Sequence, residues 1–335
     1  MVSVLDVARQ AGVSAATVSR VLSGGATVAV ETRARVMEAV QQLGYRPNAI
    51  AQSLRRGRGR TVALVTGDIE QGVYAALARE IQSQLGELDL ELMLFDMAHD
   101  DDRLMHFIER SSSLGLRGLM LAVPHMIRKD VLDALMRTSA EAGIVTLSVS
   151  QRLDHYGIAS IAPDDVGGGE TAARHLLERK RKAIGFIGRI TKSAVGRLRY
   201  DGVVNGLAAQ GKTLDPSRAW DVTRGYRFEA GYELVSHALK QKIQFDAVVG
   251  ASDEVALGGI AAAQDFGLRV PDDIAFVGFG GLRWGGYTRP SLTSVCLDVE
   301  AIAAAVGDAF RAVENGGKLP ILQLVPSPLV VRQST

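Results

Sequence analysis

Beyond residue 60 the sequence alternates short apolar runs with longer helical stretches, and no other feature restricts the possible folds as much. This alternation is typical of a parallel sheet covered by helices. A first series predicts strands at 61–65, 91–95, 118–123 and 144–149, with helices over 73–85, 103–111 and 129–142. A second series predicts strands at 183–187, 220–222, 247–250 and 274–278, with helices over 168–178, 197–210, 228–240 and 254–266. The sequence therefore predicts two similar α/β lobes, with a ligand cleft outside the carboxyl ends of the strands.

The first sixty residues differ from the rest of the chain in charge. They contain nine arginines but only three acidic side chains, a net charge of +6, whereas the whole chain carries +1. The remaining residues therefore carry a net charge of −5. A basic segment on a mildly acidic body is typical of a protein in which one part binds a polyanion and the rest avoids it.

The same basic segment shows the spacing of three short helices. Apolar residues recur at helical intervals over residues 3–11, 14–22 and 31–43. Gly12 permits a tight turn after the first helix, and Ser14 is suited to cap the second. Such a unit is either a small three-helix subdomain or a helix-turn-helix whose second helix enters a DNA major groove.

The composition of the chain, and the motifs that it lacks, exclude several other classes of protein. The single Cys296 cannot form an internal disulfide and the six histidines lack metal-ligand spacing, so we expect a reducing cytoplasm, no metal and no cofactor. The sequence contains no uncharged apolar run of the roughly 18 residues that a membrane span needs, and no signal peptide is expected at its N-terminus. It also lacks a P-loop and a Gly-x-Ser-x-Gly motif, so no catalytic residue is assigned.

Three blocks of sequence between residues 4 and 22 point to a known family. They are Asp6-Val7-Ala8, Ala11-Gly12-Val13-Ser14 and Thr17-Val18-Ser19-Arg20-Val21-Leu22. At this spacing they closely resemble the DNA-binding signature of the LacI/GalR family of bacterial repressors. The resemblance implies that residues 1–46 form an all-α helix-turn-helix domain.

The resemblance also assigns roles to the second helix. The DNA-binding residues that it implies there are Ser14, Ala15, Ala16, Thr17, Ser19 and Arg20. The two alanines and the arginine would face base edges, whereas the hydroxyl side chains would contact phosphates. Chemistry supports Arg20, because a guanidinium can pair with O6 and N7 of a guanine. Alanine offers only a methyl contact, so the operator sequence cannot be predicted from this helix.

Residues 47–60 form an arginine-rich segment between the two parts of the chain. On its own it could be a plain basic linker, because about eight helical residues are too few for a stable isolated helix in water. In the family this stretch is a hinge helix that enters the minor groove, and Leu54 matches the side chain wedged between base pairs. The resemblance adds Asn48, Ala51 and Arg55 to the DNA contacts.

The resemblance continues through the rest of the chain. The motifs that match the family's effector-binding core are Asp164-Asp165, Arg197-Leu198-Arg199, Ser252-Asp253-Glu254, Val270-Pro271-Asp272-Asp273-Ile274 and Pro290-Ser291-Leu292-Thr293-Ser294. That core is similar to two-lobed periplasmic sugar-binding proteins and crosses between its lobes three times. The resemblance therefore implies an N-terminal lobe of residues 61–159 with 289–318, and a C-terminal lobe of residues 160–288 with 319–335.

The candidate effector contacts lie near strand ends, and most have a plainer alternative role. Arg197 matches the family's ligand-binding arginine but could be a surface arginine, and Ser252 could be a helix cap. Tyr226 could stack on a ligand or fill the core. The full set of candidates is Val73, Tyr74, Ser150, Arg197, Tyr226, Ser252 and Gly280.

The predicted pocket departs from the family at two places. Many members carry Gly-[Phe/Tyr]-Asp-Asp where this chain has Gly278-Phe279-Gly280-Gly281, so the pocket loses a carboxylate. Ser150-Gln151 likewise replaces a common Asp-Arg pair. With Arg197 retained and Arg283-Trp284 near the altered strand end, we hypothesise an anionic effector such as a sugar acid or sugar phosphate.

The resemblance therefore implies a cytoplasmic transcriptional regulator of carbohydrate metabolism genes, and most members of the family are repressors. The protein would be a homodimer or a tetramer, bind double-stranded operator DNA in the nucleoid, and respond to a small sugar-like effector, with no membrane partner. A ligand-binding or transport module without a DNA role is the alternative, which the basic residues 1–60 disfavour. An α/β enzyme is a third class, and turnover of a sugar substrate would support it.

Overall fold

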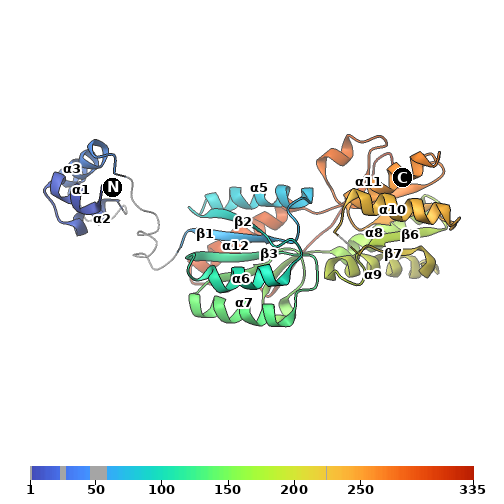
Figure 1. Cartoon of the computed structure of the whole chain (residues 1–335), viewed down its shortest axis with the longest axis horizontal. Coiled ribbons are helices and arrows are strands. Elements are labelled where there is room, and N and C mark those ends of the chain that lie inside the picture. The colour runs from blue at the N-terminus through green and yellow to red at the C-terminus, as the bar shows by residue number, and fades with distance from the viewer. Residues whose placement is uncertain (1, 23–27, 46–58, 224) are drawn as a thin grey trace. The chain divides into compact units, whose positions relative to one another are not determined.

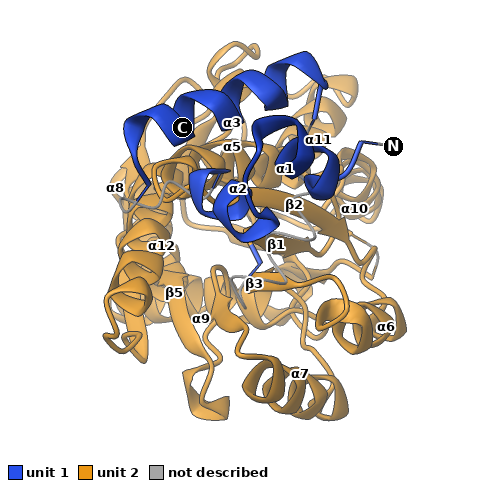
Figure 2. Cartoon of the chain, turned by 90° about the vertical axis from the view of Figure 1, so that its left-hand side faces the viewer, with its two compact units in different colours: residues 1–59 blue, residues 60–335 orange. Residues whose placement is uncertain are grey.

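The computed structural model describes residues 2–22, 28–45, 59–223 and 225–335. The chain divides into a smaller unit of residues 1–59 and a larger unit of residues 60–335 (Figure 2). Several predictions lie outside the described residues, namely the hinge contacts Asn48, Ala51, Leu54 and Arg55.

The smaller unit contains three helices: α1 (Val4–Ala11), α2 (Ala15–Leu22) and α3 (Val30–Gln42) (Figure 1). Ser3 caps α1, since its hydroxyl accepts a hydrogen bond from the Asp6 amide at 3.3 Å while the Asp6 carboxylate accepts one from the Ser3 amide at 2.9 Å. Gly12 ends α1 with a φ of +63°, a conformation that favours glycine. The core of this unit consists of Val7, Ala8, Ala11, Val18, Val21, Val36 and Ala39.

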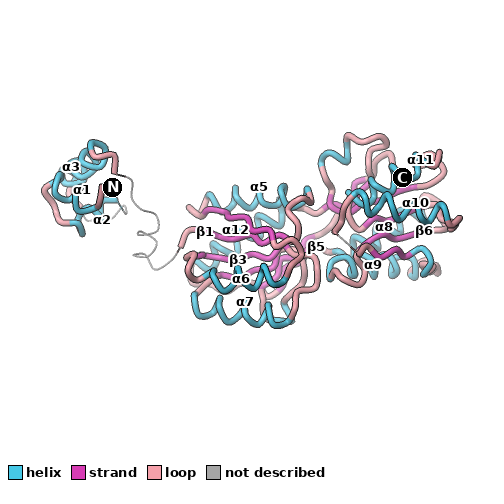
Figure 3. The backbone as a smooth tube through the Cα atoms, in the orientation of Figure 1, coloured by secondary structure: helices cyan, strands magenta, loops and turns pink. Residues whose placement is uncertain are grey.

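The first lobe of the larger unit is a six-stranded parallel sheet with helices on both faces (Figures 1 and 3). Its strands, in spatial order, are β11 (Leu322–Val325), β5 (Ala159–Pro163), β4 (Val145–Ser148), β3 (Leu116–Ala122), β1 (Thr61–Thr66) and β2 (Glu91–Asp96). Its helices are α5 (Gly72–Gly86), α6 (Asp101–Ser111), α7 (Lys129–Ala142) and α12 (Val299–Glu314). Successive residues of β1 face opposite sides, because Val62 and Leu64 pack with α5 and α12 while Ala63 and Val65 pack with α6 and α7.

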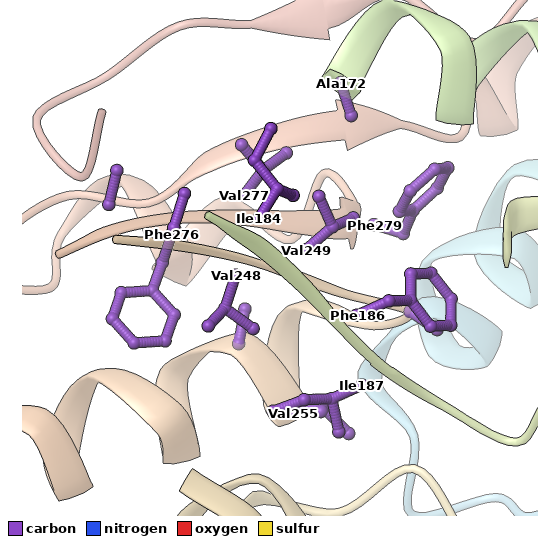
Figure 4. Packing of buried hydrophobic residues seen from close by; sticks show 14 of the residues in the cluster. Ala172, Ile184, Phe186, Ile187, Val248, Val249, Val255, Phe276, Val277 and Phe279 are labelled. Carbon is purple, nitrogen blue, oxygen red and sulfur yellow. The ribbon is translucent and has the colours of Figure 1, made fainter. Parts of the chain in front are cut away.

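The second lobe repeats this arrangement. Its strands, in spatial order, are β12 (Leu329–Val330), β10 (Thr293–Cys296), β9 (Ala275–Gly280), β8 (Ala247–Gly250), β6 (Ile184–Gly188) and β7 (Ala219–Asp221), with only β12 antiparallel to its neighbour. Its helices are α8 (Asp165–Glu178), α9 (Ala194–Ala208), α10 (Phe228–Lys240) and α11 (Asp253–Asp265), with short 3-10 turns at Pro216–Arg218 and Arg283–Gly286. A further 3-10 turn, at Asp154–Tyr156, belongs to the first lobe. Phe186, Phe276 and Phe279 are fully buried in the core of the second lobe (Figure 4).

The chain crosses between the lobes three times, but later than the sequence predicts at each crossing. The structure contradicts the predicted boundaries at 159/160, 288/289 and 318/319. β5 belongs to the first sheet, β10 to the second and β11 to the first, so the crossings follow Pro163, Cys296 and Val325. The boundaries were misplaced because these strands are short and were not recognised.

Helices α10 and α11 approach each other closely at two glycines. A Cβ atom at Gly258 would overlap the carbonyl oxygen of Phe228, and one at Gly231 would overlap the carbonyl oxygen of Val255. Both obstacles are backbone atoms, which cannot rotate away as a side chain can. The packing of this helix pair therefore depends on the absence of side chains at these two positions.

Candidate functional site

Helix α2 of the smaller unit separates an inner face from an outer face. Val18 and Val21 are buried, whereas Ser14, Ala16 and Arg20 are exposed. The Ser14 hydroxyl accepts a hydrogen bond from the Thr17 amide at 3.1 Å and lies 2.9 Å from the Thr17 hydroxyl, so it caps the helix. The outer face thus presents a cation beside small and hydroxyl side chains, a combination suited to base edges and phosphates.

A cavity lies between the lobes of the larger unit, at the carboxyl ends of several strands. Its lining includes six of the predicted effector contacts: Val73, Tyr74, Ser150, Tyr226, Ser252 and Gly280. The sequence did not single out the lining residues Gln71, Pro124, Pro163, Val195, Arg199, Glu254, Phe279, Leu282 and Leu297 as contacts. The cavity volume is about 50 Å³, below the roughly 300–1,000 Å³ of ligand pockets. A ligand would therefore have to widen it by moving side chains or lobes.

Arg199 is the buried cation of this cavity. Its Nε donates to the Asp165 carboxylate at 2.7 Å and its Nη1 to the Ala251 carbonyl at 2.7 Å. Its guanidinium also lies 4.8 Å from the ring centre of Phe279. Arg199 is 8% exposed and Asp165 3%, so the two charges compensate each other away from water.

The structure does not bring Arg197 to the cavity with the other six predicted contacts. Arg197 lies outside the cavity, with a side chain that is 54% exposed and an Nε 2.9 Å from the carboxylate of Asp201. The helical period explains the difference. Val195 and Val203 are buried and lie four residues before and after Arg199. Residues four apart share one face of a helix, so this apolar spacing indicates that Arg199, and not Arg197, lies on the buried face.

Gly280 takes the place of the carboxylate that many family members carry, and the local backbone favours this substitution. Its φ is +132°, in the region that side chains rarely adopt. The carboxylate of Asp253 already lies beside it, where it accepts hydrogen bonds from the Leu282 amide at 2.7 Å and the Ser294 hydroxyl at 2.5 Å. An aspartate at 280 would therefore place a second carboxylate against a buried one.

Several contacts join the two lobes around the cavity. The Gly72 amide at the start of α5 donates to the Glu254 carboxylate of α11 at 3.3 Å. Burial raises the pKa of Glu254. The Ser193 hydroxyl donates to the Pro124 carbonyl at 2.7 Å, and His125 forms a β-bridge with Ser193. These contacts hold the lobes against each other.

Two histidines of the first lobe, His99 and His125, are joined by polar contacts close to the place where the lobes meet. His99 Nδ1 lies 3.3 Å from His125 Nδ1, and His125 Nε2 lies 3.1 Å from the Asp101 carboxylate. A carboxylate can only accept, so neutral His125 donates from Nε2, and His99 then donates from Nδ1. Burial, followed by the charge of Arg189, lowers the pKa of His99 to about 4, and burial also lowers the pKa of His125.

These depressed histidine pKa values predict how stability changes with pH. Between pH 4 and the usual histidine pKa of 6.5, folded His99 binds fewer protons than it does in the unfolded chain. The free energy of unfolding should therefore fall as the pH is lowered from about 7 towards 4. Urea unfolding at several pH values would measure this slope. His99→Gln should flatten it.

The exposed His106 provides the matched control, since it belongs to the same lobe. His106→Gln should leave the wild-type slope unchanged. An unchanged slope in His99→Gln would show that this histidine titrates normally in the folded protein.

The described residues contain neither a candidate metal site nor a candidate membrane span. No three His, Cys, Asp or Glu side chains among the described residues are placed to hold a metal ion. None of the described helices is long and apolar enough to span a membrane.

Comparison with known proteins agrees with both parts of this architecture. The family model for bacterial regulatory proteins, lacI family, matches residues 3–48, and the model for a periplasmic binding protein-like domain matches residues 173–335. Catabolite control protein A of Priestia megaterium is 30% identical over 338 residues, covering 100% of this chain and 99% of that protein. The HTH-type transcriptional regulator GalS of Salmonella typhimurium is 29% identical over 303 residues, covering 90% and 87%.

Solved structures agree with these sequence matches. A lac repressor dimer bound to operator and the anti-inducer ONPF has a TM-score of 0.87 and 24% identity, covering 99% of this chain and 98% of that one. At this level of identity the likeness concerns the fold, which combines a helical unit with a two-lobed α/β core.

Proposed function

Because the chain belongs to the lacI family of bacterial regulatory proteins, we propose that it represses carbohydrate metabolism genes by binding operator DNA. It is a regulatory protein and not an enzyme. We further propose that it acts in the cytoplasm as a homodimer or tetramer, and at the nucleoid when bound to its operator. A two-fold symmetric dimer would read a pseudo-palindromic site.

The outer face of α2 carries the proposal for DNA binding. Its exposed Arg20 and its hydroxyl side chains match the donors that base edges and phosphates require. The nine arginines of the first sixty residues add a strong electrostatic attraction to DNA, which salt would weaken. We propose that Asn48, Ala51, Leu54 and Arg55 add minor-groove contacts.

The cavity between the lobes carries the proposal for effector control. A ligand that binds there would touch both lobes and so favour one relative arrangement of them over another. A change at the lobes could then alter the spacing of the two DNA-binding units of a dimer. Such coupling is typically worth about 1–3 kcal/mol. The effector that we propose is a small sugar-like molecule, and we retain a sugar acid or sugar phosphate as the more specific candidates.

Replacing Arg20 with alanine tests the proposal. A bidentate arginine–guanine contact is worth about 1–3 kcal/mol, so Arg20→Ala should lower the preference for the operator over random DNA by roughly 5- to 150-fold. The operator would first be selected from a random duplex library with the wild-type protein. Fluorescence anisotropy at fixed salt would then measure both affinities.

Arg79→Ala is the control, because this exposed arginine pairs with Glu80 in the larger unit. It should bind the operator like the wild type. Failure of the wild type to enrich any sequence at low salt would contradict the proposal, as would full discrimination by Arg20→Ala.

A further inference from the structure

Arg189 is a buried cation without a described partner. It directly follows β6, at the carboxyl end of a parallel strand, where ligands of such sheets bind. The residue is 8% exposed, and its Nε and Nη1 atoms have no hydrogen-bond partner among the described residues. A buried guanidinium without a compensating charge is strongly unfavourable. Arg189 therefore differs from Arg199, whose charge Asp165 compensates.

No carboxylate of the described residues forms an ion pair with the Arg189 side chain, and three acidic residues of the neighbouring segments have other partners. The carboxylate of Asp68 accepts from Arg227 at 3.2 Å, and that of Asp101 accepts from His125. The carboxylate of Asp221 accepts from the amide of Ile190 at 2.7 Å. The positive charge of Arg189 acts on His99 and His125, and it helps to lower the pKa values of both histidines. The guanidinium of Arg189 is therefore left without an ion-pair partner among the described residues.

Arg189 adjoins the cavity between the lobes. Its carbonyl oxygen and the hydroxyl of Tyr226 both lie against Gly196, so closely that a Cβ atom at Gly196 would overlap them. Tyr226 forms part of the cavity wall. A ligand held in the cavity could therefore extend past Tyr226 towards this guanidinium.

We propose that Arg189 binds an anionic group, a carboxylate or a phosphate, carried by the effector. This inference rests on the proposed function, since it concerns the same cavity. The guanidinium offers N–H donors in fixed directions, which suit the oxygens of either group. The ligand would supply the ion-pair partner that no described residue provides. The anion subsite is thus Arg189, and neither the exposed Arg197 nor the paired Arg199 provides it.

The test uses the full chain with inorganic phosphate and acetate as probes, against sodium chloride at the same ionic strength. At least one probe should raise the Tm of the wild type in a saturable way, and the more effective probe identifies the group. Arg189→Gln should weaken the apparent affinity for that probe at least about tenfold. Arg197→Gln, the matched control on the surface, should respond like the wild type.

Arg189→Lys keeps the charge but removes the planar array of donors, so its affinity should fall several-fold. The proposal is overturned if neither probe raises the wild-type Tm. It is also overturned by a wild-type response in both Arg189 variants, or in whichever of them folds. Operator binding, measured in parallel, separates the two hypotheses. A protein that binds its operator but shows no anion response would contradict the anion subsite alone.

Discussion

Asp165→Ala should lower the free energy of unfolding of the larger unit by about 3–5 kcal/mol. The substitution removes the ion-pair partner of Arg199 and leaves this buried arginine with its hydrogen bond to the Ala251 carbonyl. A desolvated, uncompensated cation is among the most destabilising changes that a single mutation can make. Urea unfolding monitored by the fluorescence of Trp220 and Trp284, both in the second lobe, would measure the loss.

The ion pair of Arg197 and Asp201 provides a matched control on the same helix, α9. Its two side chains are 54% and 38% exposed, so water already solvates both charges. Asp201→Ala should therefore change the stability by less than about 1 kcal/mol. Similar losses from the two substitutions would show that burial does not distinguish the pairs.

Gly258→Val should lower the free energy of unfolding by about 3 kcal/mol, the upper end of the usual range for overpacking. The new side chain would meet the carbonyl oxygen of Phe228, and relief would require α10 and α11 to move apart. The same urea experiment measures this effect. It would also reveal any loss of cooperativity if the helix pair separates from the sheet.

Ala261→Val is the control for this substitution, because Ala261 is an exposed residue of the same helix. It adds a β-branched side chain without a steric obstacle and should cost less than about 1 kcal/mol. If the two valines destabilise equally, helix propensity and not close packing explains the effect.

The sequence predicted the apolar strands and most of the long helices well, but not helix α12 or the strands near the lobe crossings. Strands β1 and β8 are continuous apolar runs that any periodicity analysis detects. Strands β10 and β12 have four and two residues, and their pairing with distant segments is what defines them. Helix α12 was missed although Ile302, Val306 and Phe310 recur every four residues, so the signal was present.

The site shows the same limit at the level of single residues. The sequence pattern brought Tyr74, Tyr226 and Ser252 to one cavity, as the structure places them. The sequence pattern selected Arg197, whereas Arg199 of the same helix lines the cavity. A motif match locates a segment of the chain, but it does not say which residues of that segment lie on the buried face of the helix. No sequence pattern singled out Arg189. Its lack of a hydrogen-bond partner depends on where segments distant in the sequence place their carboxylates.

The three crossings have a consequence for the order in which the protein can fold during synthesis. The first sheet is complete only when β11 has been made, after nearly the whole second lobe has left the ribosome. The helices of the smaller unit, by contrast, are available from the start, since they are local in sequence. Ribosomes that stop before residue 322 would therefore release chains that can hold a folded DNA-reading unit on an unfinished core. Such chains would carry the helix-turn-helix unit of this regulator without a complete effector-binding core.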